Sequence, residues 1–91
     1  MFPLPDDVQN FQVLGGEGMI NFQTNLSMQE VIAFYRQRFA EKGLTERTIL
    51  TEINDSGFSM VFDGWGNGKA VVIQGVDFGT NINVNIRFEE V

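Results

Sequence analysis

The stretch SMQEVIAFYRQRFAEKG, residues 27–43, decides the fold that the sequence predicts. Its large apolar residues recur with the spacing of one helix face: Met28, Val31, Ile32, Tyr35 and Phe39. Ser27 and Glu30 have the spacing of a capping box, in which each side chain accepts a hydrogen bond from the other residue's backbone N–H. Gly43 follows Lys42 where a helix commonly ends. The sequence therefore predicts a helix from Met28 to Lys42 with a single stripe that faces a core.

Six strands are predicted around this helix from the alternation of apolar and polar residues. They are expected at residues 8–14, 19–25, 45–53, 57–65, 69–78 and 80–90. Residues 69–78 are apolar on both faces, and Gly75 is expected to mark a β-bulge that changes their facing. The order ββαββββ predicts the α+β class, with an antiparallel sheet of five or six strands and one helix packed on one face.

The 91 residues are expected to form one domain, residues 1–91, because single domains commonly have about this length. Pro3 and Pro5 restrict the backbone near the start of the chain, so residues 1–6 are predicted to form an extended N-terminal arm. The glycine-rich residues 15–18 are predicted to form a flexible turn between the first two strands.

One helix covers only one face of such a sheet, so the other face must meet water or a partner. The strand at residues 80–90 places a row of asparagines opposite its apolar residues. We expect a flat hydrogen-bonding surface with apolar residues interspersed, and a solvated polar face is the competing interpretation. The possible interaction surface comprises Met19, Asn21, Gln23, Val71, Ile73, Asn81, Asn83, Asn85 and Arg87.

The segment DGWGNGKA, residues 63–70, has the composition of a ligand-binding loop but fits a turn better. A phosphate loop would need glycine at 63, a hydroxyl at 70 and a following helix, and none of these is present or predicted. A helix–loop–helix calcium loop would need ligands where Trp65 and Gln74 stand. Asn67–Gly68 is typical of a two-residue type I′ hairpin turn. Trp65 is then expected to fold back over the open face of the sheet or over its edge.

Histidine and cysteine are both absent. Catalysis by Ser–His–Asp or Cys–His groups is therefore impossible, as is zinc bound through imidazole or thiolate. The net charge of −6 opposes binding to nucleic acid and to anionic lipid. No window approaches the roughly 18 apolar residues of a membrane span. We expect no cofactor, no metal, no nucleic acid partner and no direct membrane insertion.

Carboxylates are the remaining candidates for acid–base catalysis. Asp63 and Asp77 belong to the region of the fourth and fifth predicted strands, and Glu89 and Glu90 end the last strand. Nothing in the sequence puts two of them in one apolar pocket, so no catalytic residue is predicted. Tyr35 lies in the apolar stripe, and its hydroxyl is expected to reach a backbone group or solvent.

Four short motifs stand at Leu4–Pro5, Phe22–Thr24, Phe34–Arg36 and Gly43–Leu44, in the pattern LP-x-P, F-x-T, FYR and GW or GL. In this pattern the chain resembles a loose family of short domains in bacterial exported and lipid-anchored proteins. The resemblance covers most of the chain and implies an α+β fold, but it implies no set of catalytic residues. Leu44 stands where the family frequently has tryptophan, and the chain shows no signal sequence or lipid-attachment cysteine.

These observations predict a non-enzymatic interaction module that uses the open sheet face or an edge strand. Its partner is another protein or a second copy of the chain. The alternative is a carrier that grips a small apolar ligand between helix and sheet, with phenylalanine and methionine lining the cavity. The resemblance implies a location in the cell envelope, as part of a longer precursor with Met1 added for expression, and a cytoplasmic protein is the alternative.

Overall fold

A computed structural model describes residues 2–16 and 18–90, which form one α-helix, one 3-10 helix and seven strands. The elements are β1 (Gln9–Leu14), β2 (Met19–Thr24), α1 (Met28–Glu41), β3 (Thr45–Glu46), η1 (Thr48–Leu50), β4 (Glu52–Asn54), β5 (Gly57–Asp63), β6 (Ala70–Asp77) and β7 (Ile82–Glu89). The predicted arm at residue 1 and the predicted turn at residue 17 lie outside the described residues.

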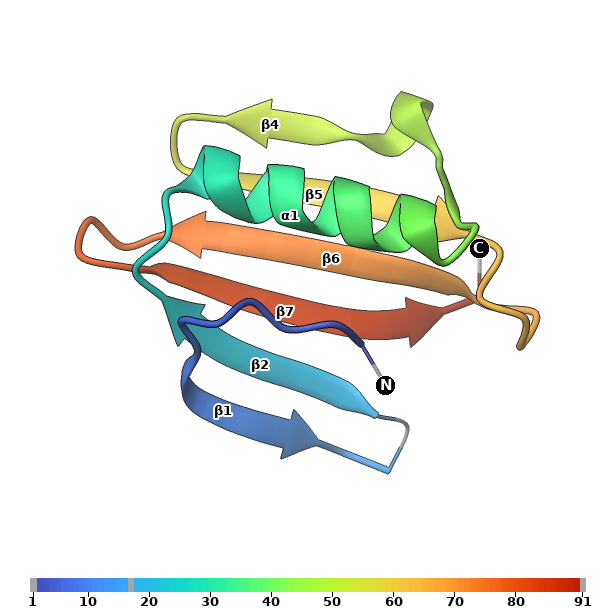
Figure 1. The fold of residues 1–91 in the computed structure, drawn as a ribbon, viewed down its shortest axis with the longest axis horizontal. Coiled ribbons are helices and arrows are strands. Elements are labelled where there is room, and N and C mark those ends of the chain that lie inside the picture. Colours follow the sequence, from blue (N-terminus) through green and yellow to red (C-terminus); the bar gives the residue numbers. More distant parts are fainter. Residues whose placement is uncertain (1, 17, 91) are drawn as a thin grey trace.

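The strands make one antiparallel sheet in the order β1-β2-β7-β6-β5-β3, and β4 also pairs with β5. The predicted α+β class, with one helix and an antiparallel sheet, is confirmed. β7 lies between β2 and β6, although more than fifty residues separate β2 from β7 in the chain. Since α1 connects β2 to β3 near the opposite edge, it must cross one face of the sheet, and Figure 1 shows it lying over that face.

Both ends of α1 are closed by the interactions that the sequence predicts. Ser27 Oγ accepts from the backbone N–H of Glu30 at 3.1 Å, and the Glu30 carboxylate accepts from the N–H of Ser27 at 2.9 Å. At the other end Gly43 has a φ of 85°, its N–H donates to the carbonyl of Ala40, and the N–H of Leu44 donates to the carbonyl of Phe39. This is a Schellman motif, and it turns Leu44 into the core.

The main core lies between α1 and one face of the sheet. The strands contribute alternate residues to it, including Ile20, Phe22, Phe58, Met60, Phe62, Val71, Ile73, Ile82, Val84 and Ile86, and the helix contributes Val31, Ile32, Tyr35 and Phe39. Buried aliphatic and aromatic side chains each stabilise the fold by about 1.5–3 kcal/mol through removal of apolar surface from water. We refer to this face as the helix face and to the opposite one as the open face.

The N-terminal arm shares the helix face with α1, which the sequence did not predict. It runs over β7 and β2, beside the helix (Figure 1). Phe2 is 4% exposed and packs against Trp65 and Phe88, with ring centroids 5.2 and 5.0 Å apart. The Tyr35 hydroxyl donates to the Pro3 carbonyl at 2.8 Å, and burial raises the pKa of this phenol. The arm therefore completes the cover that one helix leaves unfinished.

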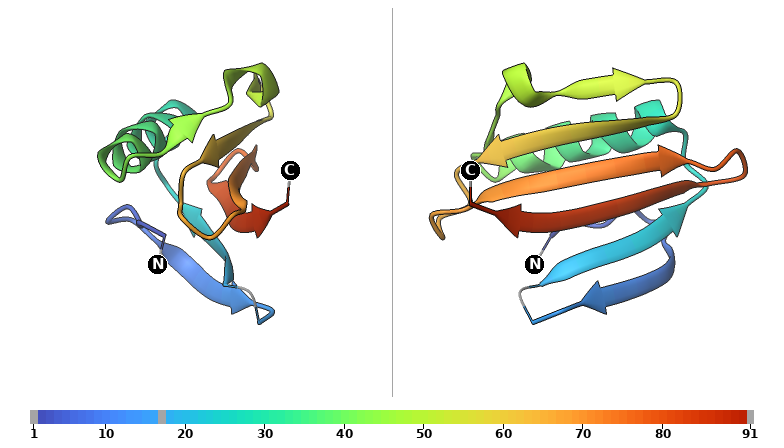
Figure 2. Two further views of the ribbon diagram at one scale, coloured as in Figure 1. Left: turned by 90° about the vertical axis from the view of Figure 1, so that its right-hand side faces the viewer. Right: turned by 180° about the vertical axis from the view of Figure 1, so that it is seen from behind.

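The prediction of one continuous strand at residues 45–53 is wrong. The structure has two strands there, β3 and β4, so the sheet has seven strands in place of the five or six expected. Both β3 and β4 pair with β5, in register Glu46↔Phe62 and Glu52↔Ser59. The five residues 47–51 therefore face only the two residues 60–61, which leaves three residues in excess. That excess forms η1, a single 3-10 turn, which lies on the side of the sheet away from α1 in Figure 2, left.

Gly75 does not mark a β-bulge. The pairing of β6 continues through it without interruption, with Phe58 opposite on β5 and Val84 opposite on β7. A Cβ atom at this position would lie 2.2 Å from Cε2 of Phe58. Glycine is therefore required for space, because the Phe58 ring occupies the volume in which a side chain would stand.

Candidate functional site

The open face carries a continuous row of polar side chains that crosses six strands. The register pairs Gln12 with Asn21, Asn21 with Asn85, Asn85 with Gln74, Gln74 with Ser59 and Ser59 with Glu52. We call Gln12, Asn21, Asn85, Gln74, Ser59 and Glu52 the amide row. Because successive strand residues point to opposite faces, all six lie on the face away from α1.

Beside the amide row, a hydrogen-bonded network joins residues of β1, β2 and β7. Gln23 Nε2 donates to Asn83 Oδ1 at 2.6 Å, and Asn10 Nδ2 donates to Gln23 Oε1 at 2.8 Å. Asn21 Nδ2 donates to the backbone carbonyl of Val84 at 3.2 Å. Asn10 reaches this position with a φ of 54°, next to the irregularity in pairing between Gln9 and Gln12 of β1. These contacts hold the amide groups in fixed orientations.

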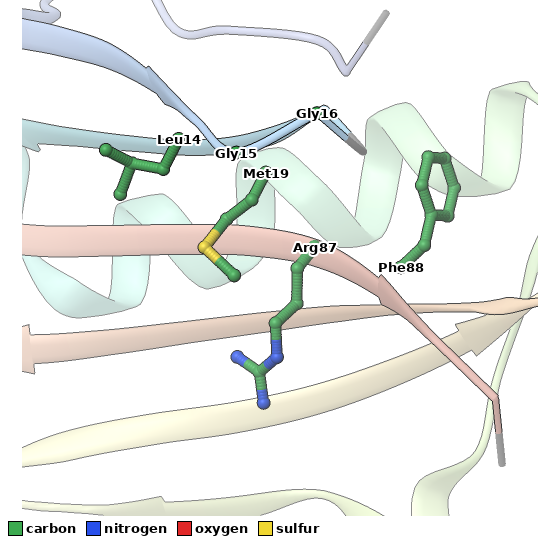
Figure 3. Close-up of a pocket in the computed structure, with 6 residues that line it drawn as sticks. All are labelled: Leu14, Gly15, Gly16, Met19, Arg87 and Phe88. Atoms are coloured by element: carbon green, nitrogen blue, oxygen red, sulfur yellow. The ribbon is translucent and has the colours of Figure 1, made fainter.

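Arg87 closes one end of the open face. Its Nη1 donates to Gln74 Oε1 at 2.7 Å, and its Nε donates to the carboxylate of Glu89. Figure 3 shows Met19 and Arg87 side by side on this face, while the neighbouring Phe88 points the opposite way. A shallow pocket of about 130 Å³ opens there, lined by Leu14, Gly15, Gly16, Met19, Arg87 and Phe88.

Two of the predicted surface residues are not on the open face. Val71 and Ile73 are fully buried and point into the core beneath α1. Their neighbours Ala70 and Val72 lie on the open face instead, in a small buried cluster with Val61. Residues 69–78 are apolar on both faces, so apolar residues alone do not reveal which way each one points. Gln74 is the informative residue: as the polar member of β6 it identifies the face of Val72 and Val76.

The other predicted surface residues keep the expected side. Met19, Asn21, Gln23, Asn83, Asn85 and Arg87 are half-buried on the open face, and Asn81 lies in the loop before β7. The prediction missed Gln12, Ser59 and Gln74. The register places them on the open face, because it pairs Gln12 with Asn21, Gln74 with Asn85 and Ser59 with Gln74.

Charged groups lie at the margin of the open face, with Glu52 on the outer strand β4 and ion-paired residues at one end. Arg47 Nη2 donates to Asp63 Oδ1 at 2.8 Å. These hydrogen bonds hold the pKa of Asp63 below its ordinary value. With Arg87 bound to Glu89, the charged residues that β5 and β7 present on this face all lie near one end. The centre of the face is therefore uncharged, in a chain with a net charge of −6.

The loop at residues 64–69 is not a two-residue type I′ turn. Asn67 lacks the positive φ that this turn needs, whereas Gly64, Gly66 and Gly68 have values of 110°, 107° and 77°. The Asn67 side chain instead accepts from the N–H of Lys69 at 3.0 Å. Trp65 was expected over the open face or over the sheet edge, and the first of these positions is wrong. Its ring lies on the helix side, 5.5 Å from the ring of Phe88 and 5.5 Å from Lys42 Nζ.

The described residues show where the candidate carboxylates and the pockets lie. Asp63 and Asp77 lie at opposite ends of the antiparallel β5–β6 pair, and none of the five pockets described is lined by two carboxylates. No cluster of three potential metal ligands occurs within residues 2–16 and 18–90. The same pockets avoid the buried residues of α1, which an apolar ligand held between helix and sheet would touch. In this part of the chain, no helix is long and apolar enough to cross a membrane.

Comparisons of the chain with models of protein families, with curated proteins and with solved structures found no match.

Proposed function

We propose that the chain is a non-enzymatic protein-interaction module whose open face packs against the same face of a second copy. The uncharged centre of that face carries the proposal. Protein surfaces are ordinarily rich in charge, whereas the centres of interfaces are depleted in it. Here the amide side chains and their apolar neighbour Val76 occupy the centre, and the charged groups, Glu52 of the amide row among them, lie at the margin.

Amide side chains make such a face complementary to itself. Each asparagine or glutamine supplies two N–H donors and a carbonyl acceptor. Two amide rows brought face to face therefore meet both donors and acceptors, whichever copy supplies them. A two-fold axis makes each residue's contact occur twice, as in most soluble dimers.

The size of the face indicates a weak dimer. Five strands spaced about 4.8 Å apart and about seven residues long cover roughly 550 Å². Two such faces bury about 1,100 Å², at the lower end of specific interfaces, where transient complexes are found. We therefore expect a dimer that dissociates on dilution.

Backbone amide NMR spectra recorded across a dilution series test this proposal. The expected result is a set of concentration-dependent shifts at Asn21, Gln74, Asn85 and their neighbours on the open face. Gln74→Lys should abolish them, because dimerisation would bring two ammonium groups together near the axis. Gln37→Lys, the same change on exposed α1, should leave them intact. A native spectrum that does not change with concentration would overturn the proposal.

The resemblance to domains of bacterial exported proteins supports a second part of the proposal, that the module works in the cell envelope. Fractionation of the cells that express it, with detection by antibody, measures this directly. Recovery in the cytosolic fraction would instead favour the cytoplasmic alternative.

A further inference from the structure

An apolar pocket lies at one end of the molecule, away from the open face. It is lined by Phe2, Gly18, Trp65 and Phe88 and has a volume of about 210 Å³. The three aromatic rings contact one another, with centroids 5.0 to 5.5 Å apart. A cavity of about 150 Å³ lined by apolar side chains is enough to bind benzene. The pocket therefore has room for one aromatic side chain, which would contact the three rings that line it.

An aromatic side chain is exposed at the opposite end of the molecule. Phe78 is 64% exposed, in the loop between β6 and β7. The backbone of this loop is held by hydrogen bonds: the N–H of Phe78 donates to the Asn81 carbonyl at 2.9 Å, and the N–H of Gly79 donates to Asp77 Oδ1 at 2.7 Å. A backbone fixed in advance in this way loses little conformational entropy on binding.

We propose that Phe78 of one molecule inserts into the Phe2–Trp65–Phe88 pocket of a second copy and joins the two head to tail. The contact cannot form within one molecule. Val71 of β6 pairs with Phe88 of β7, and Phe78 follows Val71 by seven residues, just beyond the end of β6, about 23 Å away at the rise of a strand. Figure 1 shows the 78–81 loop and the 64–69 loop at opposite ends of the long axis.

Charge complementarity accompanies the fit of the rings. Asp77 precedes Phe78 and is exposed, and Lys42 is exposed beside the pocket with its Nζ 5.5 Å from the centre of the Trp65 ring. Insertion of Phe78 brings the Asp77 carboxylate of one copy toward the Lys42 ammonium of the next. The chain has twice as many acidic as basic residues, and the positive charge of Lys42 attracts the loop that carries Asp77.

The geometry of this contact has a defined consequence for assembly. The contact is heterologous, since the loop and the pocket are different surfaces, and each molecule retains one free loop and one free pocket. Open chains of variable length form unless the rotation between copies closes a ring. The proposed function uses a separate surface, so neither proposal depends on the other.

Trp65 is the only tryptophan of the chain and lines the pocket, so its fluorescence reports occupancy directly. We expect the emission of the native protein to change between micromolar and millimolar concentration, together with a rising sedimentation coefficient. Phe78→Ser should weaken the association by roughly tenfold or more, as removal of a central aromatic anchor does. Ile49→Ser, the same kind of change at a residue 93% exposed in η1, should behave like the native chain.

A mixing experiment tests the loop and the pocket independently, by using one variant that keeps only the pocket side of the contact and another that keeps only the loop side. The Phe78→Ser variant keeps its pocket and its tryptophan, while Trp65→Phe keeps its loop and is silent when tryptophan alone is excited. Addition of Trp65→Phe should change the emission of Phe78→Ser, and addition of a Trp65→Phe, Phe78→Ser double variant should not. Asp77→Asn retains the acceptor for the Gly79 N–H and should remove the salt dependence of the association. Emission independent of concentration, or equal association by native and Phe78→Ser chains, would overturn the proposal.

Discussion

At the scale of single residues, Gly75 is the described glycine at which an added Cβ would meet another atom most closely, and that atom belongs to Phe58. A methyl group at Gly75 would lie 2.2 Å from one ring carbon of Phe58 and 2.9 Å from two others. The buried ring cannot move away without displacing its neighbours in the core. Gly75→Ala should therefore lower the free energy of unfolding by about 1–3 kcal/mol, the usual cost of overpacking, as measured by urea denaturation.

Gly16→Ala is the matched control. No atom lies within 4 Å of the position that its Cβ would take, and its φ is not in the left-handed region. The change should leave stability within about 0.5 kcal/mol of the native value. Phe58→Leu should recover part of the loss in the Gly75→Ala background. Equal effects of the two glycine substitutions would show that the Phe58 ring does not set the requirement.

At the scale of elements, the ion pair between Arg36 and Glu46 ties α1 to β3. Arg36 donates to both carboxylate oxygens of Glu46, at 2.9 and 3.1 Å, and Thr51 donates to the same group. These hydrogen bonds hold the pKa of Glu46 below its ordinary value of 4.5. A lowered pKa means that the stabilisation is complete above the ordinary value and is lost as pH falls through the folded-state pKa.

Arg36→Gln should accordingly reduce stability at neutral pH by up to about 1 kcal/mol, because the pair is partly exposed. The difference from the native protein should shrink as the pH is lowered below 4.5, which urea denaturation at a series of pH values measures. Arg38→Gln is the control, since its pair with Glu41 spans 3.7 Å and is about half exposed on both sides. A difference that stays constant with pH would contradict the role of Glu46.

The elements that the sequence predicted well are those with local signals. α1 has a capping residue, an apolar stripe and a stopping glycine, all within seventeen residues. The division of residues 45–53 into β3, η1 and β4 has no such signal, because it arises from three residues in excess against the partner strand. The facing of β6 was equally inaccessible from apolar residues alone, and Val71 and Ile73 were assigned to the wrong side for that reason.

At the scale of the whole molecule, stability should fall from the centre of the sheet to its edges. β6 and β7 are paired on both sides, whereas β1 is exposed along one edge and irregular in pairing at Gln9–Gln12. We expect the amides of β6 and β7 to exchange with solvent only through global unfolding, and those of β1 to exchange faster through local opening. Hydrogen exchange followed by NMR measures both, and equal protection of β1 and β7 would contradict this gradient.

The open face was predictable as a surface, because one helix cannot cover two faces and the asparagines of β7 alternate with apolar residues. The aromatic pocket was not predictable. It depends on Phe2, Trp65 and Phe88 meeting from three separate parts of the chain, and on the arm docking beside α1. No periodic sequence pattern predicts this contact, because each of the three aromatic residues stands alone in its own segment.

The position of β7 between β2 and β6 also governs the order of events during biosynthesis. The ribosome releases β1, β2 and α1 well before β7, so the β1–β2 hairpin emerges with the edge of β2 unsatisfied. Pairing of β2 with β7 closes a loop of more than fifty residues, and such long-range closure is slow. A nascent chain paused before β7 would expose both β2 and β6 as templates for foreign strands. The interval before β7 appears is therefore when binding by a chaperone would protect the chain most.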